Sequence, residues 1–146
     1  QAHTHQHITA APRLSELGAE IAVAKAKSAA GLSIADVSYA AVYDSFTITL
    51  AMLLEDLGLA GRGEAAARVR AGHFGRDGAM PLNTHGGLLS SGHCGVGGAM
   101  AHLVETHLQM TERAGARQVR DASIALLHGD GGVLSSHVSM FLERVR

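Results

Sequence analysis

The residues best suited to chemistry lie in one glycine-rich stretch of this 146-residue sequence. Residues 83–98 read Asn-Thr-His-Gly-Gly-Leu-Leu-Ser-Ser-Gly-His-Cys-Gly-Val-Gly-Gly and lead into an apolar helical pattern. Glycine has no Cβ and adopts positive φ, so such a loop can bring backbone amides close to an oxyanion or a carbonyl oxygen. Histidine is the side chain that best suits proton transfer near neutral pH. The stretch predicts a catalytic loop built on His93, with Gly86, Gly87 and Gly92 as loop positions.

Two further residues could join this loop. Tyr43 follows an apolar strand pattern, and its phenol can donate a hydrogen bond to a carbonyl or act as an acid or base. His128 precedes a second glycine turn that contains Gly131 and Gly132. Each candidate also has a structural interpretation: Tyr43 packs or caps a helix, while His93 or His128 binds a backbone carbonyl. The residues alone leave both interpretations open.

Other reactive side chains are interpreted as structural. Cys94 is a weak nucleophile candidate, because no neighbouring cation lowers its pKa unless His93 does so. Asp44 and Asp130 are expected to cap helices or form turns. His102 and His107 lie within a helical pattern and are expected at its surface.

Three histidines alternate near the start of the chain. His3, His5 and His7 would share one face of a strand and could bind a metal ion. No cysteine or carboxylate nearby completes a coordination set, so we expect no metal site.

Composition excludes several classes of protein. A net charge of -1 gives no basic face for nucleic acid. A single cysteine excludes an internal disulfide and suits a reducing compartment, which indicates the cytoplasm. There is no apolar run long enough for a membrane span and no signal peptide. The length suits one domain at 1–146, and a start at Gln1 rather than Met indicates a piece of a longer protein.

The hydrophobic pattern predicts the elements that must position these candidates. In chain order it predicts a β-like segment at 1–9, helix 15–30, strand 37–42, helix 45–57, a loop-rich stretch at 58–82 holding a short helix at 64–69, helix 99–113, strand 123–127, the glycine turn 128–132 and strand 133–142. Ser15 and Gly31 are expected to cap the first helix, and Asp44 or Ser45 the second. This order predicts an α/β domain whose mixed sheet is covered by helices. We expect Tyr43 and the two glycine loops to meet at one edge of that sheet.

Four segments in this order resemble the C-terminal half of thiolases, most closely the branch of sterol-carrier-type thiolases and lipid-transfer proteins. The resemblance covers nearly the whole chain. Its segments are Ala2-His3-Thr4-His5-Gln6-His7, Tyr43-Asp44-Ser45-Phe46, Asn83-Thr84-His85-Gly86-Gly87 with Gly92-His93, and His128-Gly129-Asp130-Gly131-Gly132.

The resemblance implies a fold and partners. Two similar halves would form an α/β/α/β/α layered sandwich, usually within a homodimer, and this chain would be the second half. The nucleophilic cysteine would lie in the absent N-terminal half, so this chain alone would expose apolar surface and complete no catalytic cycle. The substrate would be an acyl-CoA or CoA, with no covalently bound cofactor and no metal.

The resemblance also implies roles for the three candidates. His93 looks like the histidine that activates the nucleophile and polarises the thioester carbonyl. Tyr43 stands where thiolases have the Asn or His that orders an oxyanion-hole water, and His128 where condensing thiolases have a second cysteine. Cys94 replaces a usual proline.

These departures leave three functions open. The first is acyl transfer of the thiolase kind. The second is retro-aldol cleavage of a β-hydroxyacyl-CoA, as in steroid side-chain aldolases that use a tyrosine and pair with an OB-fold protein of the DUF35 type. The third is a non-catalytic subunit that binds acyl-CoA or lipid.

Overall fold

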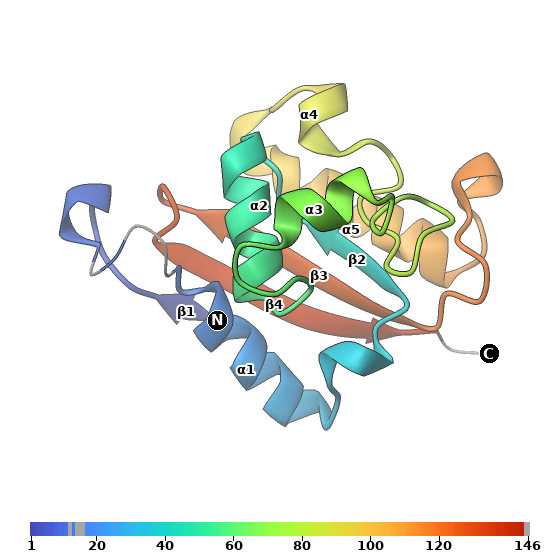
Figure 1. Cartoon of the computed structure of the whole chain (residues 1–146), viewed down its shortest axis with the longest axis horizontal. Helices are drawn as coiled ribbons and strands as arrows, with labels where there is room; N and C mark the ends of the chain where they lie inside the picture. The colour runs from blue at the N-terminus through green and yellow to red at the C-terminus, as the bar shows by residue number, and fades with distance from the viewer. Residues whose placement is uncertain (12, 14–16, 145–146) are drawn as a thin grey trace.

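A four-stranded mixed sheet forms the centre of the molecule. The computed structural model describes residues 1–11, 13 and 17–144 (Figure 1). The strand order is β1-β4-β3-β2, with β2 parallel to β3 and β4 antiparallel to both β3 and β1. The elements are β1 (Ala2–His3), α1 (Ala19–Ala30), β2 (Tyr39–Val42), α2 (Thr47–Asp56), α3 (Ala65–Arg70), α4 (Gly87–Ser91), α5 (Gly98–Met110), β3 (Ile124–Gly131) and β4 (Ser136–Glu143). The predicted α/β class with a mixed sheet is confirmed.

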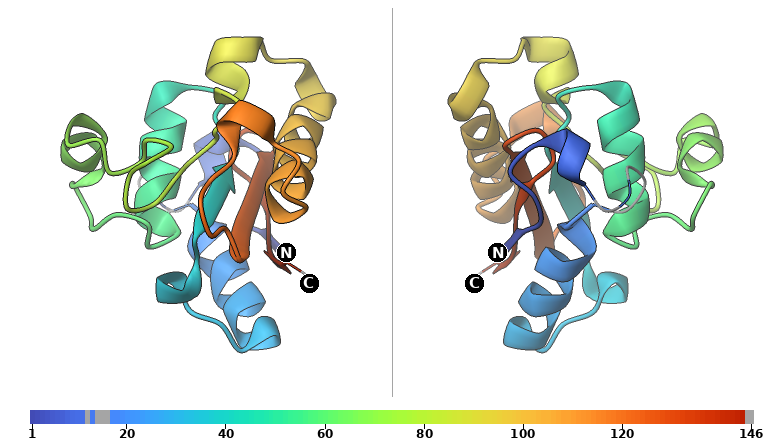
Figure 2. Two further views of the ribbon diagram at one scale, coloured as in Figure 1. Left: turned by 90° about the vertical axis from the view of Figure 1, so that its right-hand side faces the viewer. Right: turned by 90° about the vertical axis from the view of Figure 1, so that its left-hand side faces the viewer.

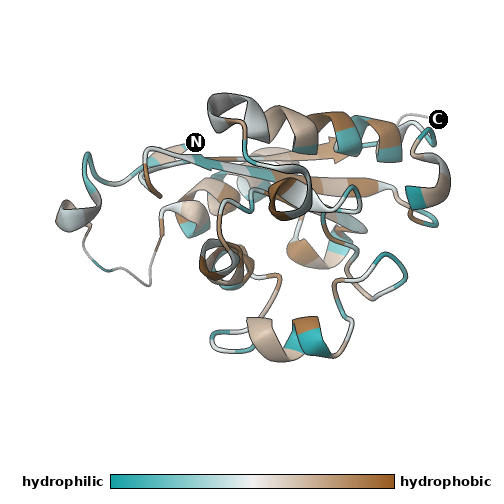
Figure 3. Ribbon diagram, turned by 90° about the horizontal axis from the view of Figure 1, so that it is seen from above, coloured by the Kyte–Doolittle hydropathy of each residue, from teal (hydrophilic) through white to brown (hydrophobic). Residues whose placement is uncertain are grey.

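Helices cover both faces of this sheet. Helices α1 and α2 lie on one face and α5 on the other (Figures 2 and 3). Alternate residues of β3 serve the two layers: Leu126 joins the core under α1 and α2, whereas Ala125 and Leu127 join the core under α5. Strand β2 is buried along its whole length, as its continuous apolar pattern predicts. No helix within the described residues is long and apolar enough to cross a membrane.

The predicted helix ends are confirmed in part. Gly31 ends α1 in the left-handed conformation, with φ 66° and its amide bonded to the Lys27 carbonyl. Helix α1 begins only at Ala19, after Gly18, and the predicted cap Ser15 lies outside the described residues. Neither Asp44 nor Ser45 caps α2, whose N-cap is Phe46. That prediction was wrong because Asp44 bonds to α4, a helix that the sequence pattern did not reveal.

The second glycine turn lies later in the chain than the sequence predicts. Strand β3 continues through the predicted turn at 128–132, because Gly129 and Gly131 keep the regular antiparallel register with β4. The chain reverses instead at 132–135, where Val133 and Leu134 have φ of 55° and 63°. His128 therefore lies within a strand rather than in a loop.

The first segment is less regular than predicted. Strand β1 holds only two residues, and a 3₁₀ turn follows at Ile8–Ala10. His3 donates or accepts one hydrogen bond with Ser136, and His5 is buried beside the Val133 carbonyl, so the alternation does not produce one histidine face. Within the described part of the chain, no group of three or more His, Cys, Asp or Glu side chains could hold a metal ion.

One buried amide joins the glycine-rich stretch to the sheet. The side chain of Asn83 accepts a hydrogen bond from the Val42 amide at 2.8 Å and donates one to the Val42 carbonyl at 2.7 Å. It thereby replaces a neighbouring strand at the end of β2 and holds the start of the loop there.

Replacing Asn83 should destabilise the fold. In Asn83→Ala both backbone groups of Val42 lose their partner while they remain buried, which should lower the free energy of unfolding by about 2 kcal/mol. Urea unfolding followed by circular dichroism measures this change. An unchanged midpoint would show that the Val42 groups do not depend on Asn83.

Candidate active site

Tyr43, His93 and Asp130 meet at the edge of the sheet where β2 and β3 end. Because these strands are parallel, their carboxyl ends share one edge, and the Tyr43 amide continues the ladder by donating to the His128 carbonyl at 2.9 Å. The three side chains line one pocket of about 290 Å³. Its wall also includes Phe46 from the start of α2 and the turn after β3.

The side chains of Tyr43 and His93 are hydrogen-bonded to each other in this pocket. The Tyr43 oxygen lies 2.6 Å from His93 Nε2. His93 Nδ1 accepts a hydrogen bond from the Gly95 amide at 3.2 Å, so a neutral ring carries its proton on Nε2 and donates it to the phenol oxygen. The phenol hydrogen is then free to point at a substrate. Burial, and next the charge of Asp130, raise the pKa of Tyr43, so the phenol is a hydrogen-bond donor at neutral pH.

Asp44 holds the glycine-rich loop in place from the residue next to Tyr43. Its carboxylate accepts bonds from the Leu88 and Leu89 amides at 2.9 and 3.3 Å, and lies 3.1 Å from His102 Nε2 on α5. Burial opposes the charge, but the His102 contact and the two amides outweigh burial and lower the pKa of Asp44. The start of α4 is thus already occupied by a carboxylate.

The predicted surface position of His102 was wrong. Its side chain is fully buried between Asp44 and His85, whose ring packs edge-on at 5.0 Å. The helical period of α5 brings His102 inward, and the nearby carboxylate makes a polar ring tolerable there. His107 is exposed, as predicted.

Asp130 is a site residue that the sequence analysis set aside as a turn former. It lies in β3, and its Oδ1 is buried with no hydrogen-bond partner in the part of the chain that the structure describes. Burial raises the pKa of Asp130 to about 6, against the opposing effect of His93. The signal that could have revealed it is its position at the carboxyl end of a buried parallel strand, where ligands bind in open α/β sheets.

His128 is not part of this pocket wall. It is fully buried in β3, with Nδ1 2.8 Å from the Ser139 hydroxyl and Nε2 3.3 Å from His137. Burial, and then the neighbouring His137, lower the pKa of His128 to about 3, so its ring is neutral. Its predicted acid/base role stays a prediction.

The predicted loop glycines are divided between the two loops. Gly86, Gly87, Gly92 and Gly132 have positive φ, and Gly131 lies at the end of β3. A Cβ on Gly87 would overlap the Asp44 carboxylate, so glycine is required there by close approach as well as by φ. Cys94, which follows α4 in the chain and precedes α5, is an exposed free thiol.

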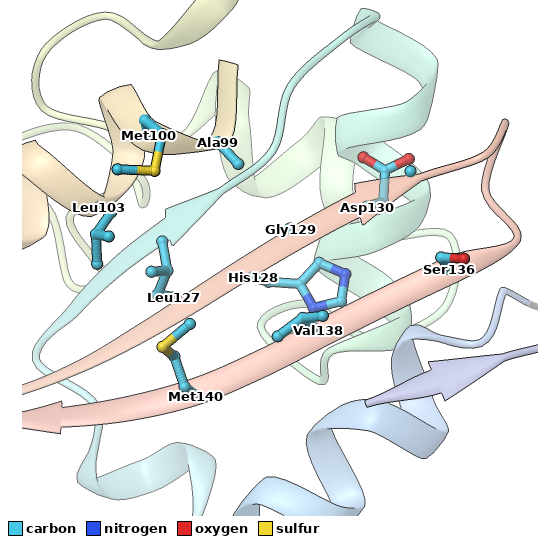
Figure 4. A pocket seen from close by; sticks show the side chains of 11 residues that line it. Ala99, Met100, Leu103, Leu127, His128, Gly129, Asp130, Ser136, Val138 and Met140 are labelled. Atoms are coloured by element: carbon cyan, nitrogen blue, oxygen red, sulfur yellow. The ribbon is translucent and has the colours of Figure 1, made fainter. Parts of the chain in front are cut away.

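An apolar groove runs beside the pocket. It has a volume of about 360 Å³, lies between α5 and strands β3 and β4, and shares Asp130 and Gly131 with the pocket (Figure 4). Met100 and Val104 on α5 are 55% and 54% exposed, and Met140 on β4 is 41% exposed. These values mark an apolar surface of the kind that another protein segment covers.

A family model and several known proteins match most of this chain. The sequence profile described as thiolase C-terminal domain-like matches residues 1–144. An acetyl-CoA acetyltransferase from Methanothermobacter thermautotrophicus is 34% identical over 112 residues, which cover 75% of this chain and 29% of that protein. A steroid side-chain-cleaving aldolase from Thermomonospora curvata is 28% identical over 137 residues, which cover 94% of this chain and 33% of that protein.

The fold is also found in a solved structure. A chain of the Ltp2-ChsH2(DUF35) aldolase superposes with a TM-score of 0.82 and 23% identity, over 99% of this chain and 38% of that one. This chain therefore spans about a third of the length of the two relatives and less than half of that structure.

Two glycines offer a matched test of the Asp44 contact. Gly31→Ala places a Cβ in open space at φ 66° and should cost about 1 kcal/mol of unfolding free energy from backbone strain alone. Gly87→Ala adds the displacement of the buried carboxylate and should cost about 3 kcal/mol or more. Urea unfolding compares them; equal losses would mean that the Asp44 contact contributes nothing.

Stability should depend on the protonation of His128. The unfolded histidine titrates near about 6.5, above the folded pKa of about 3. Between these values the unfolded chain binds the extra proton, so the free energy of unfolding should decrease as the pH falls from about 6.5 toward about 3.

A variant isolates this contribution. His128→Gln cannot take up the proton, so between about pH 7.5 and pH 5 it should lose about 2 kcal/mol less stability than the wild type. Urea midpoints at the two pH values measure the difference, and His107→Gln on the exposed side of α5 is the control. Parallel curves for wild type and His128→Gln would contradict the assignment.

Proposed function

Since this chain belongs to the thiolase C-terminal domain-like family, we propose that it is the C-terminal half of an acyl-CoA enzyme that makes or breaks a carbon–carbon bond next to a thioester. The observation that carries the proposal is the pair formed by Tyr43 and His93 in a pocket at the carboxyl edge of the sheet. A thioester oxygen placed beside the Tyr43 hydroxyl would receive its hydrogen bond. Negative charge that develops on that oxygen as an enolate forms is stabilised by such a donor.

Within this class we infer retro-aldol cleavage of a β-hydroxyacyl thioester as the reaction. Tyr43 carries a protonated phenol whose oxygen is supported by the His93 Nε2 proton, so the pair suits enolate stabilisation without a covalent intermediate. The aldolase from Thermomonospora curvata, which resembles 94% of this chain, supports this choice.

Acyl transfer is the second candidate. The similarity to an acetyl-CoA acetyltransferase supports it, with the nucleophilic cysteine supplied by the N-terminal half. His93 would then polarise the thioester, and a covalent acyl-enzyme would form on that cysteine.

The partners belong to the same proposal. The apolar groove between α5 and β4 would be covered by the N-terminal half, and two such proteins would form a homodimer. The likeness of the fold to a DUF35-containing aldolase makes an OB-fold protein a candidate third component. Acyl-CoA or CoA is the proposed substrate, and a reducing compartment such as the cytoplasm suits the exposed Cys94 thiol.

Activity of the full-length protein should depend on both members of the pair. Tyr43→Phe removes one hydroxyl and little volume, and should reduce cleavage of 3-hydroxyacyl-CoA by about 100-fold. His93→Ala should reduce it at least as far, because the phenol loses its supporting donor. Release of acetyl-CoA from 3-hydroxyhexanoyl-CoA, followed by liquid chromatography, measures the rates.

The other tyrosine is the matched control. Tyr39→Phe, fully buried in β2, should retain wild-type activity. Mass spectrometry of the protein with acetyl-CoA separates the two chemistries, since only acyl transfer gives a covalent acyl-cysteine. Full activity in both site variants would show that Tyr43 and His93 are not catalytic and would leave this half of the protein only a binding role.

A further inference from the structure

We propose that Asp130 is the general base of this pocket, which takes the proton from the substrate and returns it to the α-carbon; the inference rests on the proposed function. Three titratable side chains line the pocket: Tyr43, His93 and Asp130. A general base must have a free electron pair that can accept the proton.

Two of the three are already engaged. His93 accepts the Gly95 amide on Nδ1 and binds the Tyr43 oxygen through Nε2, so neither ring nitrogen is left to accept a proton from substrate. Tyr43 keeps its own proton near neutral pH and therefore donates. Neither side chain supplies the base that carbon–carbon cleavage next to a thioester requires.

Asp130 has an oxygen with a free electron pair, which His93 and Tyr43 lack. Its Oδ1 is buried and has no hydrogen-bond partner among the described residues, an arrangement that costs free energy in a structural side chain. Asp130 lies one residue before the end of β3 and lines both the pocket and the apolar groove (Figure 4). A carboxylate in that position faces whatever ligand fills the space.

The groups around Asp130 suit its role as a general base. The titratable groups near it are Tyr43 after β2 and His93 after α4. On the sheet, His128 shares a face of β3 with Asp130, and His137 is the cross-strand partner of Asp130. Burial is the main cause that brings the pKa of Asp130 to about 6, and His93 acts in the opposite direction. A base with such a pKa is mostly ionised at neutral pH yet strong enough to hold a proton transiently.

Cleavage of the Cα–Cβ bond needs only the substrate, Asp130 and Tyr43. Asp130 takes the proton of the β-hydroxyl, whose O–H electron pair becomes the carbonyl bond of the leaving aldehyde or ketone. The Cα–Cβ bond breaks, and its electron pair forms the enolate whose oxygen Tyr43 stabilises. Asp130 then returns its proton to the α-carbon, which yields the shortened acyl thioester.

Removal of a proton from the α-carbon of the product, which is the reverse of the protonation by Asp130, can be measured directly. The base that protonates the α-carbon must also remove a proton from the product, so the full-length protein should exchange the α-hydrogens of acetyl-CoA for deuterium in heavy water. Mass spectrometry of acetyl-CoA follows the exchange. The wild-type rate should rise with pH through about 6, the pKa of Asp130.

Three variants test the residue. Asp130→Asn should lower the exchange rate by about 100-fold and abolish the rise near that pH. Asp130→Ala should be equally slow and should recover when formate is added, because a small carboxylate can occupy the vacated space. Asp121→Asn, an exposed aspartate with a φ of 57° that asparagine also adopts, should behave as wild type.

The outcomes separate this inference from the proposed function. Wild-type exchange rates in Asp130→Asn, a loss that formate does not restore with the pH dependence intact, or no exchange by the wild type would each overturn Asp130 as the base. Asp130-dependent exchange of acetyl-CoA without cleavage of 3-hydroxyhexanoyl-CoA would support the base and overturn the carbon–carbon cleavage.

Discussion

The buried carboxylate of Asp44 is the contact on which the geometry of the site depends. It follows Tyr43 directly, so it fixes the end of β2 relative to two other elements: the first amides of α4 and the inner face of α5 through His102. A carboxylate taken out of water is costly unless every oxygen is bonded, so the three elements are held at the one separation that satisfies it. The position of His93 against the Tyr43 phenol follows from this, since the loop that carries His93 begins at the end of α4.

The sequence was most informative where a local pattern coincides with burial. Strand β2 is apolar at consecutive positions and is covered on both sides, and α3 and α5 fall close to their predicted ranges. Helix α4 was missed because it has only five residues, begins with a glycine, and is stabilised by the side chain of Asp44, which lies 44 positions before Leu88. Sequence periodicity carries no information about a cap that comes from so far along the chain.

The difference between local and distant contacts also explains which site residues could be predicted from the sequence. Tyr43 and His93 were found from their positions beside a strand end and within a glycine loop, and the structure places them in contact. His128 and Asp130 stand in one run of glycines, so the sequence pattern placed both in a turn, with His128 as the acid/base candidate and Asp130 as a turn former. In the structure β3 pairs with β4 at both residues, but His128 is enclosed against Ser139 and His137, whereas Asp130, two residues further along, lines the pocket. The register of β3 with β4 depends on contacts between distant parts of the chain. It could not be predicted because a run of glycines is also typical of a turn.

The order of strands in the sheet has a consequence for how the chain acquires its structure during synthesis. Strand β2 is synthesised long before its hydrogen-bonded neighbour β3 and the next strand β4, and β1 pairs only with β4. No pair of strands can therefore form until nearly the whole domain has been translated. Folding of this kind is slow, because distant segments must meet before any pairing is gained. Meanwhile the apolar β2 segment remains unpaired in the nascent chain, which makes it a segment prone to aggregate or to bind chaperones during synthesis.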